Sequence, residues 1–293
     1  MKLSRRQSLA ASLLALPLAT LAARPALGAG VEDRLAALEA RQPGRLCVAI
    51  LGLGSGRRSG HRADEPMLLC STFKALAAAF VLARVDRGAE QLDRRIVFAP
   101  DAVLPGWSPV TAKRSGAPGM TVAELCDAVV TLSDNTAANL LLQSFGGPAA
   151  LTAFCRDLGD TVTRLDRIEP ELNNHDGPQD RRDTTTANAM LDSLRRLIFD
   201  EVLSGPSRSQ FAAWLIANKT GDRQLRAGMP AGWLVGDKTG SNGDAVGNVN
   251  DVAVIWPADR APLIVTAYCV LPSLERQQRY AVLAEIGRIA AAG

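Results

Sequence analysis

Apolar and polar residues follow two different periodicities along this chain of 293 residues. Residues 31–41 carry apolar side chains at helical spacing and stop before Pro43-Gly44, which predicts a helix. The apolar run at 45–54 is typical of a strand. A Gly-Ser-Gly turn leads from that run into 57–62, which would complete a hairpin.

The middle of the chain, from about Ser71 to Phe211, has mostly helical patterns. Loops rich in Gly, Pro and Asp separate these patterns, and the longest loop spans 164–183. Strand patterns return late and are followed by one more helical pattern: strands at 233–239, 250–256 and 263–271, and a helix at 273–291. Strands therefore stand near both ends of the sequence, with helices between them.

The simplest arrangement pairs the strands from both ends into one mainly antiparallel sheet. We expect a two-lobed α+β fold that forms a single catalytic domain. Residues 29–63 and 215–293 would make an α/β lobe, with a five-stranded sheet flanked by the terminal helices. Residues 64–214 would make an inserted all-helical lobe. A ligand site is expected in the cleft between the two lobes.

Residues 1–28 have the composition of an export signal. They contain four basic residues and no acidic one, a charge-free apolar stretch from Gln7 to Ala23, and a small-residue exit at Ala26-Leu27-Gly28. The paired Arg5-Arg6 resembles a twin-arginine signal, which implies a periplasmic protein; an uncleaved anchor is the alternative. Removing this segment turns the net charge of +3 into −1 and leaves no stretch long enough to span a membrane.

The remaining composition excludes several classes of function. With 33 basic and 30 acidic residues, bulk charge gives no reason to expect nucleic-acid binding. The two histidines, His61 and His175, lie far apart, which argues against a His-based metal site and a Ser-His-Asp triad. We expect no metal and no cofactor. The five cysteines lack CxxC spacing and mostly stand in apolar stretches, so they predict buried free thiols.

Four short segments carry candidate chemistry. Ser71 and Lys74, at i and i+3 of a helix, place a hydroxyl and an ammonium on one face, where a lysine of lowered pKa can activate a serine. The other segments are Ser133-Asp134-Asn135, Glu169-Pro170-Glu171-Leu172-Asn173 and Lys238-Thr239-Gly240-Ser241. Taken singly, each also fits an ordinary role: a capped helix with a surface lysine, a helix cap, an acidic loop and a hairpin turn.

As an ordered set, the four segments resemble the class A serine β-lactamases. The resemblance extends over the whole chain after residue 28 and includes three further phrases: Arg164-Leu165-Asp166-Arg167, Arg182-Asp183-Thr184 and Gly236-Asp237-Lys238. It implies a β-lactamase-like fold and hydrolysis of β-lactam antibiotics through a serine acyl-enzyme, which confers resistance. It also implies a small-molecule β-lactam substrate, no cofactor and a monomer.

The resemblance assigns the catalytic roles. Ser71 would attack the lactam carbonyl, with the backbone amides of Ser71 and Ser241 as the oxyanion hole. Lys74 would relay or accept the proton of the nucleophile, and Ser133 would pass a proton to the leaving nitrogen. Glu169, assisted by Asn173, would hold the water that hydrolyses the acyl-enzyme. Whether Glu169 or Lys74 is the base in acylation stays open.

The resemblance also assigns binding and structural roles. Asn135 would bind the side-chain amide of the substrate, and Trp107 would stand at the mouth of the site; a partly buried core tryptophan is the alternative. The segment Lys238-Thr239-Gly240-Ser241 would surround the substrate carboxylate. Arg167 and Asp183 would pair across the neck of the long loop, where loss of one partner would leave a costly lone charge.

Three departures from the family pattern stand out. Family members supply an arginine for the substrate carboxylate at one of two positions. Here the first position holds Gln224 and the second falls near Val249, so we expect weaker substrate binding with the chemistry intact. The loop segment 174–177 is one residue longer than usual. Cys70 and Cys126 stand where some relatives have bridging cysteines, but the partner positions hold Asn242 and Ala78, so no disulfide is expected.

Two other functions share part of this pattern. A penicillin-binding DD-peptidase has similar serine and lysine motifs but lacks the loop with Glu169 and Asn173. A β-lactam sensor is acylated once and needs a membrane tether, which the chain after residue 28 does not offer. Hydrolysis of β-lactams is therefore the leading interpretation.

Overall fold

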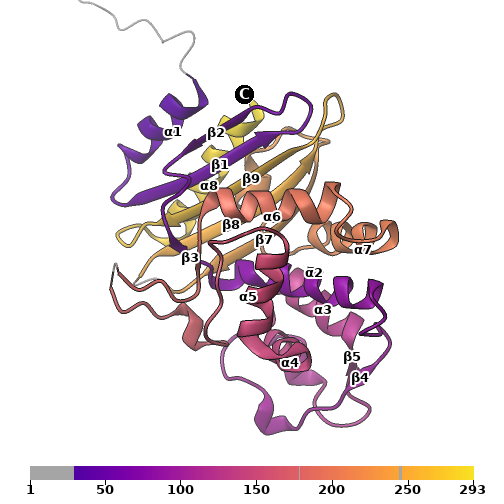
Figure 1. The fold of residues 1–293 in the computed structure, drawn as a ribbon. Coiled ribbons are helices and arrows are strands. Elements are labelled where there is room, and N and C mark those ends of the chain that lie inside the picture. The colour runs from indigo at the N-terminus through magenta and orange to yellow at the C-terminus, as the bar shows by residue number, and fades with distance from the viewer. Residues whose placement is uncertain (1–29, 178, 244–245) are drawn as a thin grey trace, which may run out of the picture.

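A five-stranded antiparallel sheet forms the centre of the protein, seen here in a computed structural model that describes residues 30–177, 179–243 and 246–293 (Figure 1). The strand order is β2-β1-β9-β8-β7. The strands span, in chain order, β1 Arg45–Gly52, β2 Arg58–His61, β7 Leu234–Ser241, β8 Asn248–Trp256 and β9 Leu263–Val270. The predicted antiparallel sheet built from both ends of the chain is confirmed.

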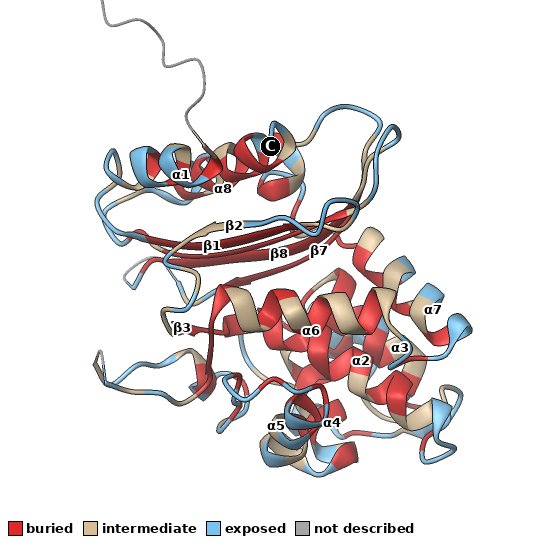
Figure 2. Cartoon of the chain, turned by 45° about the horizontal axis from the view of Figure 1, so that its top comes forward, coloured by how far each residue is buried: buried red, intermediate tan, exposed pale blue. Residues whose placement is uncertain are grey.

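The sheet separates two hydrophobic layers. On its outer face lie α1 (Val31–Glu39) and α8 (Arg276–Ala291), side by side in Figure 2. Their apolar side chains pack with outward-facing strand residues such as Val48 and Val265. Inward-facing strand residues such as Cys47 and Ile264 belong instead to the larger core of the helical side. Side chains from one strand thus reach both layers, as the period of two requires.

The helical side contains six α-helices among the described residues, seen below the sheet in Figure 2. They are α2 Phe73–Asp86, α3 Val122–Thr131, α4 Asn135–Phe145, α5 Gly147–Asp157, α6 Ala187–Phe199 and α7 Gly205–Ile216. Helix α2 is buried on nearly every side, which makes it the central helix of this lobe. The boundaries of the two lobes stay a prediction.

Short elements connect these helices. The 3₁₀ turns are η1 Cys70–Thr72, η2 Pro100–Ala102, η3 Thr111–Lys113, η4 Glu171–Asn173 and η5 Leu225–Gly228. Two small antiparallel ladders join β3 (Met67–Leu68) to β6 (Thr184–Thr185) and β4 (Arg95–Ile96) to β5 (Met120–Thr121). The β3–β6 ladder ties the start of the nucleophile segment to the end of the long loop.

Several element ends differ from the sequence predictions. Helix α8 begins at Arg276 rather than Ser273, because Glu275 and Gln278 form a capping box there. Strand β7 continues to Ser241 because its pairing with β8 extends that far, and β8 accordingly begins at Asn248. Helix α1 ends at Glu39.

Other predictions concern the termini and the cysteines. The expected export signal lies outside the described residues. Among the described helices, none has the length and apolar character needed to cross a bilayer. All five cysteines are buried and free, as their apolar surroundings predicted.

Candidate active site

The candidate nucleophile, Ser71, lies in η1 immediately before α2. Its neighbour Cys70 has a φ of +44°, a left-handed conformation that is uncommon for residues other than glycine. The Ser71 side chain is half-buried, and its Oγ lies 3.4 Å from Oε1 of Glu169. The hydroxyl is therefore close to a carboxylate that is 98 residues away in the sequence.

Lys74 lies one helical turn beyond Ser71, and its side chain is completely buried. Its Nζ is 2.9 Å from Oε1 of Glu169, and it donates to the carbonyl of Ser133 at 2.9 Å and to Oδ1 of Asn135 at 2.6 Å. Burial lowers the pKa of Lys74, and the negative charge of Glu169 opposes that shift. The lysine therefore joins three segments that the sequence had singled out separately.

Glu169 is held in place by two asparagines. Asn173, which lies in η4 four residues after Glu169, donates from Nδ2 to Oε2 of Glu169 at 2.7 Å. Asn139, on α4, contacts the backbone of Glu169 twice: its Nδ2 donates to the carbonyl at 2.8 Å, and its Oδ1 accepts from the amide at 3.0 Å. The peptide bond between Glu169 and Pro170 is cis. The carboxylate is only 1% exposed, so its position is fixed from all sides.

The long loop that carries Glu169 is closed at its neck by Asp183. This carboxylate is fully buried and accepts from Nε of Arg167 at 2.6 Å, so the two residues form the pair that the sequence suggested. It also accepts from the backbone amides of Asp166 at 2.7 Å and Arg167 at 2.9 Å. The loop is thus anchored at both ends through one side chain.

Ser133 lies between the two buried lysines. Its Oγ accepts from Nζ of Lys238 at 3.0 Å and is 3.5 Å from Nζ of Lys74. Burial, followed by repulsion from Lys74, lowers the pKa of Lys238 to about 7. An ammonium of lowered pKa in contact with a hydroxyl is suited to passing a proton.

Asp134 holds the turn that carries Ser133 and Asn135 in place. Its buried carboxylate accepts from the amide of Ala137, as the helix cap of α4. The same carboxylate accepts from the amides of Val110 and Thr111 and from the Thr111 hydroxyl. The segment that leads from Trp107 into the site is therefore bound to the turn that carries Ser133 and Asn135.

The end of β7 forms the opposite wall. Gly240 packs so tightly against the nucleophile segment that an added Cβ would lie 3.1 Å from both the Ser71 amide nitrogen and the Leu69 carbonyl oxygen. The strand then places Ser241 next along the wall. Thr239 is joined to Thr220 by a hydrogen bond of 2.6 Å between their hydroxyls. This close approach brings the two backbone amides proposed for an oxyanion hole into one region.

A cleft of about 240 Å³ is lined by most of the predicted site residues. They are Ser71, Trp107, Ser133, Asn135, Glu169, Asn173, Thr239, Gly240 and Ser241. Trp107 is 58% exposed, with its indole donating to the Leu132 carbonyl, so the alternative of a core tryptophan is wrong. Lys74 and Lys238 are not among the lining residues, because both are completely buried.

Sequence reasoning missed several residues that shape this cleft. Arg276 and Tyr280, both on α8, line it together with Thr220, and Asn139 holds Glu169 from behind. Arg276, Tyr280 and Asn139 belong to no recognisable motif, whereas Thr220 is the threonine of the Thr-Gly phrase from which position 224 is counted. The helical pattern at 273–291 was the only sequence feature that included Arg276 and Tyr280. It did not predict that this helix would begin beside the end of β7.

The structure also shows what lies at the positions where family members have an arginine for the substrate carboxylate. Gln224 and Val249 line the cleft, as their counted positions suggested. Of the two nearby arginines, Arg226 pairs with the buried Asp237 beneath the sheet edge. Arg223 lies 5.8 Å from the ring of Tyr280 and is not among the residues that line the cleft.

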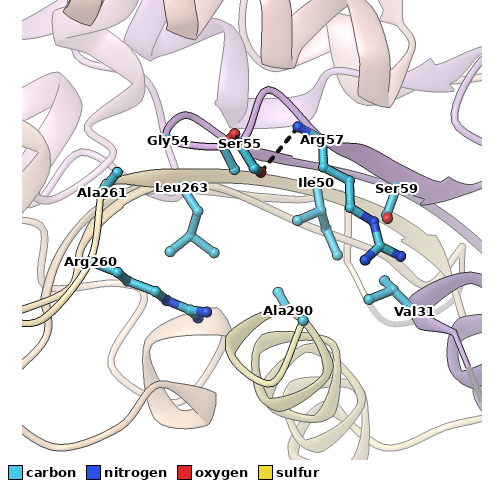
Figure 3. A pocket seen from close by; sticks show the side chains of 12 residues that line it. Val31, Ile50, Gly54, Ser55, Arg57, Ser59, Arg260, Ala261, Leu263 and Ala290 are labelled. Atoms are coloured by element: carbon cyan, nitrogen blue, oxygen red, sulfur yellow. Dashed lines mark hydrogen bonds between the residues drawn. The ribbon is translucent and has the colours of Figure 1, made fainter. Parts of the chain in front are cut away.

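A second hollow, of about 310 Å³, lies on the outer face of the sheet (Figure 3). Its floor is apolar, formed by residues such as Ile50 and Leu263, with Arg57 and Arg260 on opposite sides. None of the predicted site residues lines it. Among the described residues there is also no group of three or more acidic, histidine or cysteine side chains placed to hold a metal.

Comparison with known proteins agrees with this geometry. The model of the β-lactamase enzyme family matches residues 30–292. The chain is 48% identical to β-lactamase L2 of Stenotrophomonas maltophilia, covering 96% of this chain and 93% of the relative. It is 45% identical to the carbapenem-hydrolysing β-lactamase KPC of Klebsiella oxytoca, covering 96% and 94%.

Among solved structures, an ancestral class A β-lactamase (GNCA) aligns with a TM-score of 0.85 at 57% identity, covering 88% of this chain and 98% of that one. Sequence, fold and cleft agree in what they indicate. The chain belongs to the β-lactamase enzyme family, as a class A serine β-lactamase that hydrolyses β-lactam antibiotics and so confers resistance to them.

Proposed function

We propose that hydrolysis proceeds through an ester on Ser71, formed and broken with Glu169 as the principal base. The observation that carries this proposal is the 3.4 Å separation between Ser71 Oγ and Glu169 Oε1. Two oxygens at that distance can share one water molecule, through which the proton of the hydroxyl can pass to the carboxylate. The Ser71 oxygen forms a bond to the lactam carbonyl carbon, and the backbone amides of Ser71 and Ser241 hold the oxyanion.

Opening of the lactam ring requires a proton on the departing nitrogen. Ser133 supplies this proton from Oγ, and Lys238, 3.0 Å away, donates a hydrogen bond to that oxygen and stabilises it as the proton leaves. Lys74 connects Glu169 to Ser133 and so returns the proton taken from the nucleophile. The three groups form a continuous chain of hydrogen bonds from the attacking oxygen to the leaving nitrogen.

Deacylation uses the same carboxylate a second time. Glu169 removes a proton from a water molecule that attacks the ester carbon, and that proton returns to Ser71 Oγ as its bond to the acyl carbon breaks. Asn173 orients both the carboxylate and the water. General-base assistance of this kind is worth about 10²–10⁴-fold in rate. Trp107 and Asn135 contact the side chain of the substrate, and Thr239 and Ser241 contact its carboxylate.

The test is a pair of glutamate variants on the same loop. Glu169→Ala is expected to be acylated by a cephalosporin and to keep the added mass, because the water loses its base. Glu171→Ala removes an exposed glutamate two residues away and serves as the control, with turnover close to that of the parent. If Glu169→Ala turns over like the control, Glu169 is not the base of deacylation; if it is acylated as fast as the parent, Glu169 is not the principal base of acylation.

The same measurement addresses the two rival functions. With excess chromogenic cephalosporin, a hydrolase gives many turnovers per molecule. A DD-peptidase or a sensor gives a single stoichiometric burst. The Glu169–Asn173 contact supports the first outcome, because that pair serves no purpose in an enzyme that stays acylated.

We propose that residues 1–28 direct this enzyme to the periplasm through the twin-arginine route, where it acts as a monomer. The Arg5-Arg6 pair before an apolar stretch supports the route. Replacing both arginines with lysine keeps the charge and is expected to retain the precursor in the cytoplasm. Export that is unchanged in this variant would point to a different route.

A further inference from the structure

Three residues of the sheet lie directly against the turn that carries the nucleophile. Gly240, Asn250 and Tyr268 stand opposite one another on β7, β8 and β9, so they share one face of the sheet. Tyr268 belongs to the core of the helical side, which identifies this face as the inner one. We call the three residues the inner row, and residues 68–72 the nucleophile turn. Asn250 and Tyr268 are completely buried and take no part in the steps described above.

Asn250 binds the backbone of the nucleophile turn. Its Nδ2 donates to the carbonyl oxygen of Leu68 at 2.9 Å and to that of Leu69 at 3.3 Å. Gly240, directly opposite, has no side chain that would keep the turn away, and a Cβ added there would lie 3.1 Å from the Leu69 carbonyl oxygen. The sheet therefore holds the turn at the carbonyl group of Leu69.

Tyr268 reaches the same carbonyl group through Thr72. The Thr72 hydroxyl donates to the Leu69 carbonyl oxygen at 2.7 Å and lies 3.1 Å from the Tyr268 hydroxyl. A hydroxyl has a single proton, so in the second contact the tyrosine is the donor. The Leu69 carbonyl thus accepts from Asn250 and from Thr72, and Tyr268 orients the Thr72 hydroxyl.

The position of this carbonyl group affects the oxyanion hole. The Leu69 carbonyl belongs to the peptide plane before Cys70, whose φ of +44° lies in a region that residues other than glycine keep only where their surroundings enforce it. Rotation about that φ turns the next peptide plane, which carries the Ser71 amide. Fixing the Leu69 carbonyl therefore fixes the direction of the Ser71 N–H, one of the two donors proposed for the oxyanion.

Stability alone does not account for an asparagine at position 250. Its Oδ1 is buried and has no hydrogen-bond partner among the described residues. The side-chain amide cannot turn over to relieve this, because Oδ1 would then face two carbonyl oxygens. A buried acceptor without a partner is unfavourable, and a leucine of similar branched shape would avoid it.

We propose that Asn250 is a positioning residue for the nucleophile turn, assisted by Tyr268. It holds the Leu69 carbonyl and so aims the Ser71 amide at the oxyanion. This inference rests on the serine ester mechanism proposed above and adds the residue that orients one of its donors. Asn250 does not line the cleft, so it acts on the rate and not on substrate binding. An oxyanion forms in acylation and in deacylation, so both steps depend on it.

The experiment compares Asn250→Leu with Thr266→Val. Thr266 is also a buried polar residue of the inner face, but it donates to the Ala187 carbonyl at 2.7 Å, at the start of α6 and away from the nucleophile turn. Asn250→Leu is expected to lower kcat for a penicillin about tenfold, with KM within about twofold of the parent value. Thr266→Val should change neither constant.

Two further measurements separate positioning from a loss of stability. A boronic acid forms a tetrahedral adduct with Ser71 that places an oxygen in the oxyanion hole, so its inhibition constant should rise in Asn250→Leu by about the factor by which kcat falls. The melting temperature of this variant should stay within about 4 °C of the parent, because the lost donor and the removed unpaired acceptor offset each other.

A second variant tests the same contacts with a smaller change. Tyr268→Phe removes only the hydroxyl that orients Thr72, and the ring continues to fill its place in the core. We expect kcat to fall about fivefold, as loss of one buried hydrogen bond predicts, with KM again close to the parent value. This variant keeps the proposal testable if Asn250→Leu does not fold.

The outcomes distinguish this proposal from the catalytic one. A kcat for Asn250→Leu that matches Thr266→Val, or a rise in KM with kcat unchanged, overturns the role of Asn250 while turnover of the parent stands. A lower kcat with unchanged inhibition by the boronic acid also overturns it, because the oxyanion hole would then be intact. Parental kcat in Tyr268→Phe removes Tyr268 from the proposal and, where Asn250→Leu does not fold, overturns it. Failure of the parent enzyme to turn over any β-lactam would instead remove the catalytic proposal.

Discussion

Burial of Lys238 makes folding of this enzyme depend on pH. The pKa of Lys238 is about 7 in the folded protein, against about 10.4 for an exposed lysine. Between these two values the unfolded chain binds a proton that the folded protein lacks. Raising the pH through this window therefore stabilises the folded state, and below pH 7 the residue contributes no pH dependence.

The variant Lys238→Met tests this linkage, because methionine fills similar space without titrating. The free energy of unfolding of the parent should rise relative to the variant by about 2 kcal/mol between pH 7.5 and 9.5. Urea unfolding curves at three pH values measure the difference. Parallel pH dependence of the two proteins would contradict the lowered pKa.

Gly240 is a residue at which one methyl group matters. A Cβ there would press on the Leu69 carbonyl and the Ser71 amide at 3.1 Å, so Gly240→Ala must widen the gap between β7 and the nucleophile. We expect kcat/KM to fall about tenfold or more, because oxyanion donors are sensitive to small displacements. Gly205→Ala is the control, since an added Cβ meets nothing there within 4 Å. Equal activity of the two variants would argue against this contact.

The sequence predicted the catalytic residues far better than it predicted the residues that hold them in place. Ser71, Lys74, Ser133 and Glu169 could be found because the chemistry requires particular residue types at short spacings. Asn139 gave no such signal, since an asparagine in the middle of a helix pattern looks ordinary until the chain folds back upon it. Side chains that act through distant contacts are defined by the tertiary structure.

At the scale of elements, the loop with Glu169 depends on a single carboxylate. Asp183→Ala removes the acceptor for Arg167 and for two backbone amides, which leaves a lone charge and two unpaired donors at the neck. We expect deacylation to slow more than acylation, because deacylation depends on the loop for Glu169, Asn173 and the position of the water, whereas the nucleophile Ser71 lies outside the loop.

Burst kinetics with a chromogenic cephalosporin measure both steps of the Asp183→Ala enzyme. The burst should persist while the steady rate falls by about tenfold or more. Asp192→Ala breaks an exposed ion pair with Arg58 and should leave both phases unchanged. A variant that loses burst and steady rate in equal proportion would show that the loop supports acylation as well.

The ends of elements were the least predictable part of the fold. The pattern of apolar residues located four strands of the main sheet, and the Gly-Ser-Gly turn located the fifth, β2. The apolar pattern placed the start of α8 at 273, because Ser273 and Leu274 continue the helical pattern. The helix begins only where Glu275 and Gln278 cap it. Strand β7 extends to Ser241 through pairing with β8, which begins two residues earlier than the sequence predicted.

At the scale of the whole molecule, substitutions in the two hydrophobic layers should differ in their effects on stability and on activity. Leu283 is fully buried in the outer layer between α8 and the sheet and does not itself line the cleft. Leu283→Ala should lower the free energy of unfolding by about 2–5 kcal/mol, as expected for a cavity in a packed core. The folded fraction should keep its kcat/KM.

The matched control is Leu234→Ala, which truncates a leucine that is 48% exposed on β7. It should change stability by about 0.5 kcal/mol or less. Thermal unfolding and steady-state kinetics on the same samples measure both effects. A large loss of kcat/KM in Leu283→Ala below its melting temperature would show that the outer layer transmits strain to the cleft.

The pairing of β1 with β9 has a consequence for how the protein forms. Arg45 pairs with Val270 and Gly52 with Leu263, so the partner of β1 on this side is a strand that lies more than 200 residues later in the sequence. During synthesis on the ribosome, the β1 edge of the β1–β2 hairpin therefore stays unpaired until nearly the entire polypeptide has emerged. Contacts of such separation make folding slow. A chain released before residue 263 would have no partner for that edge and would be prone to aggregate.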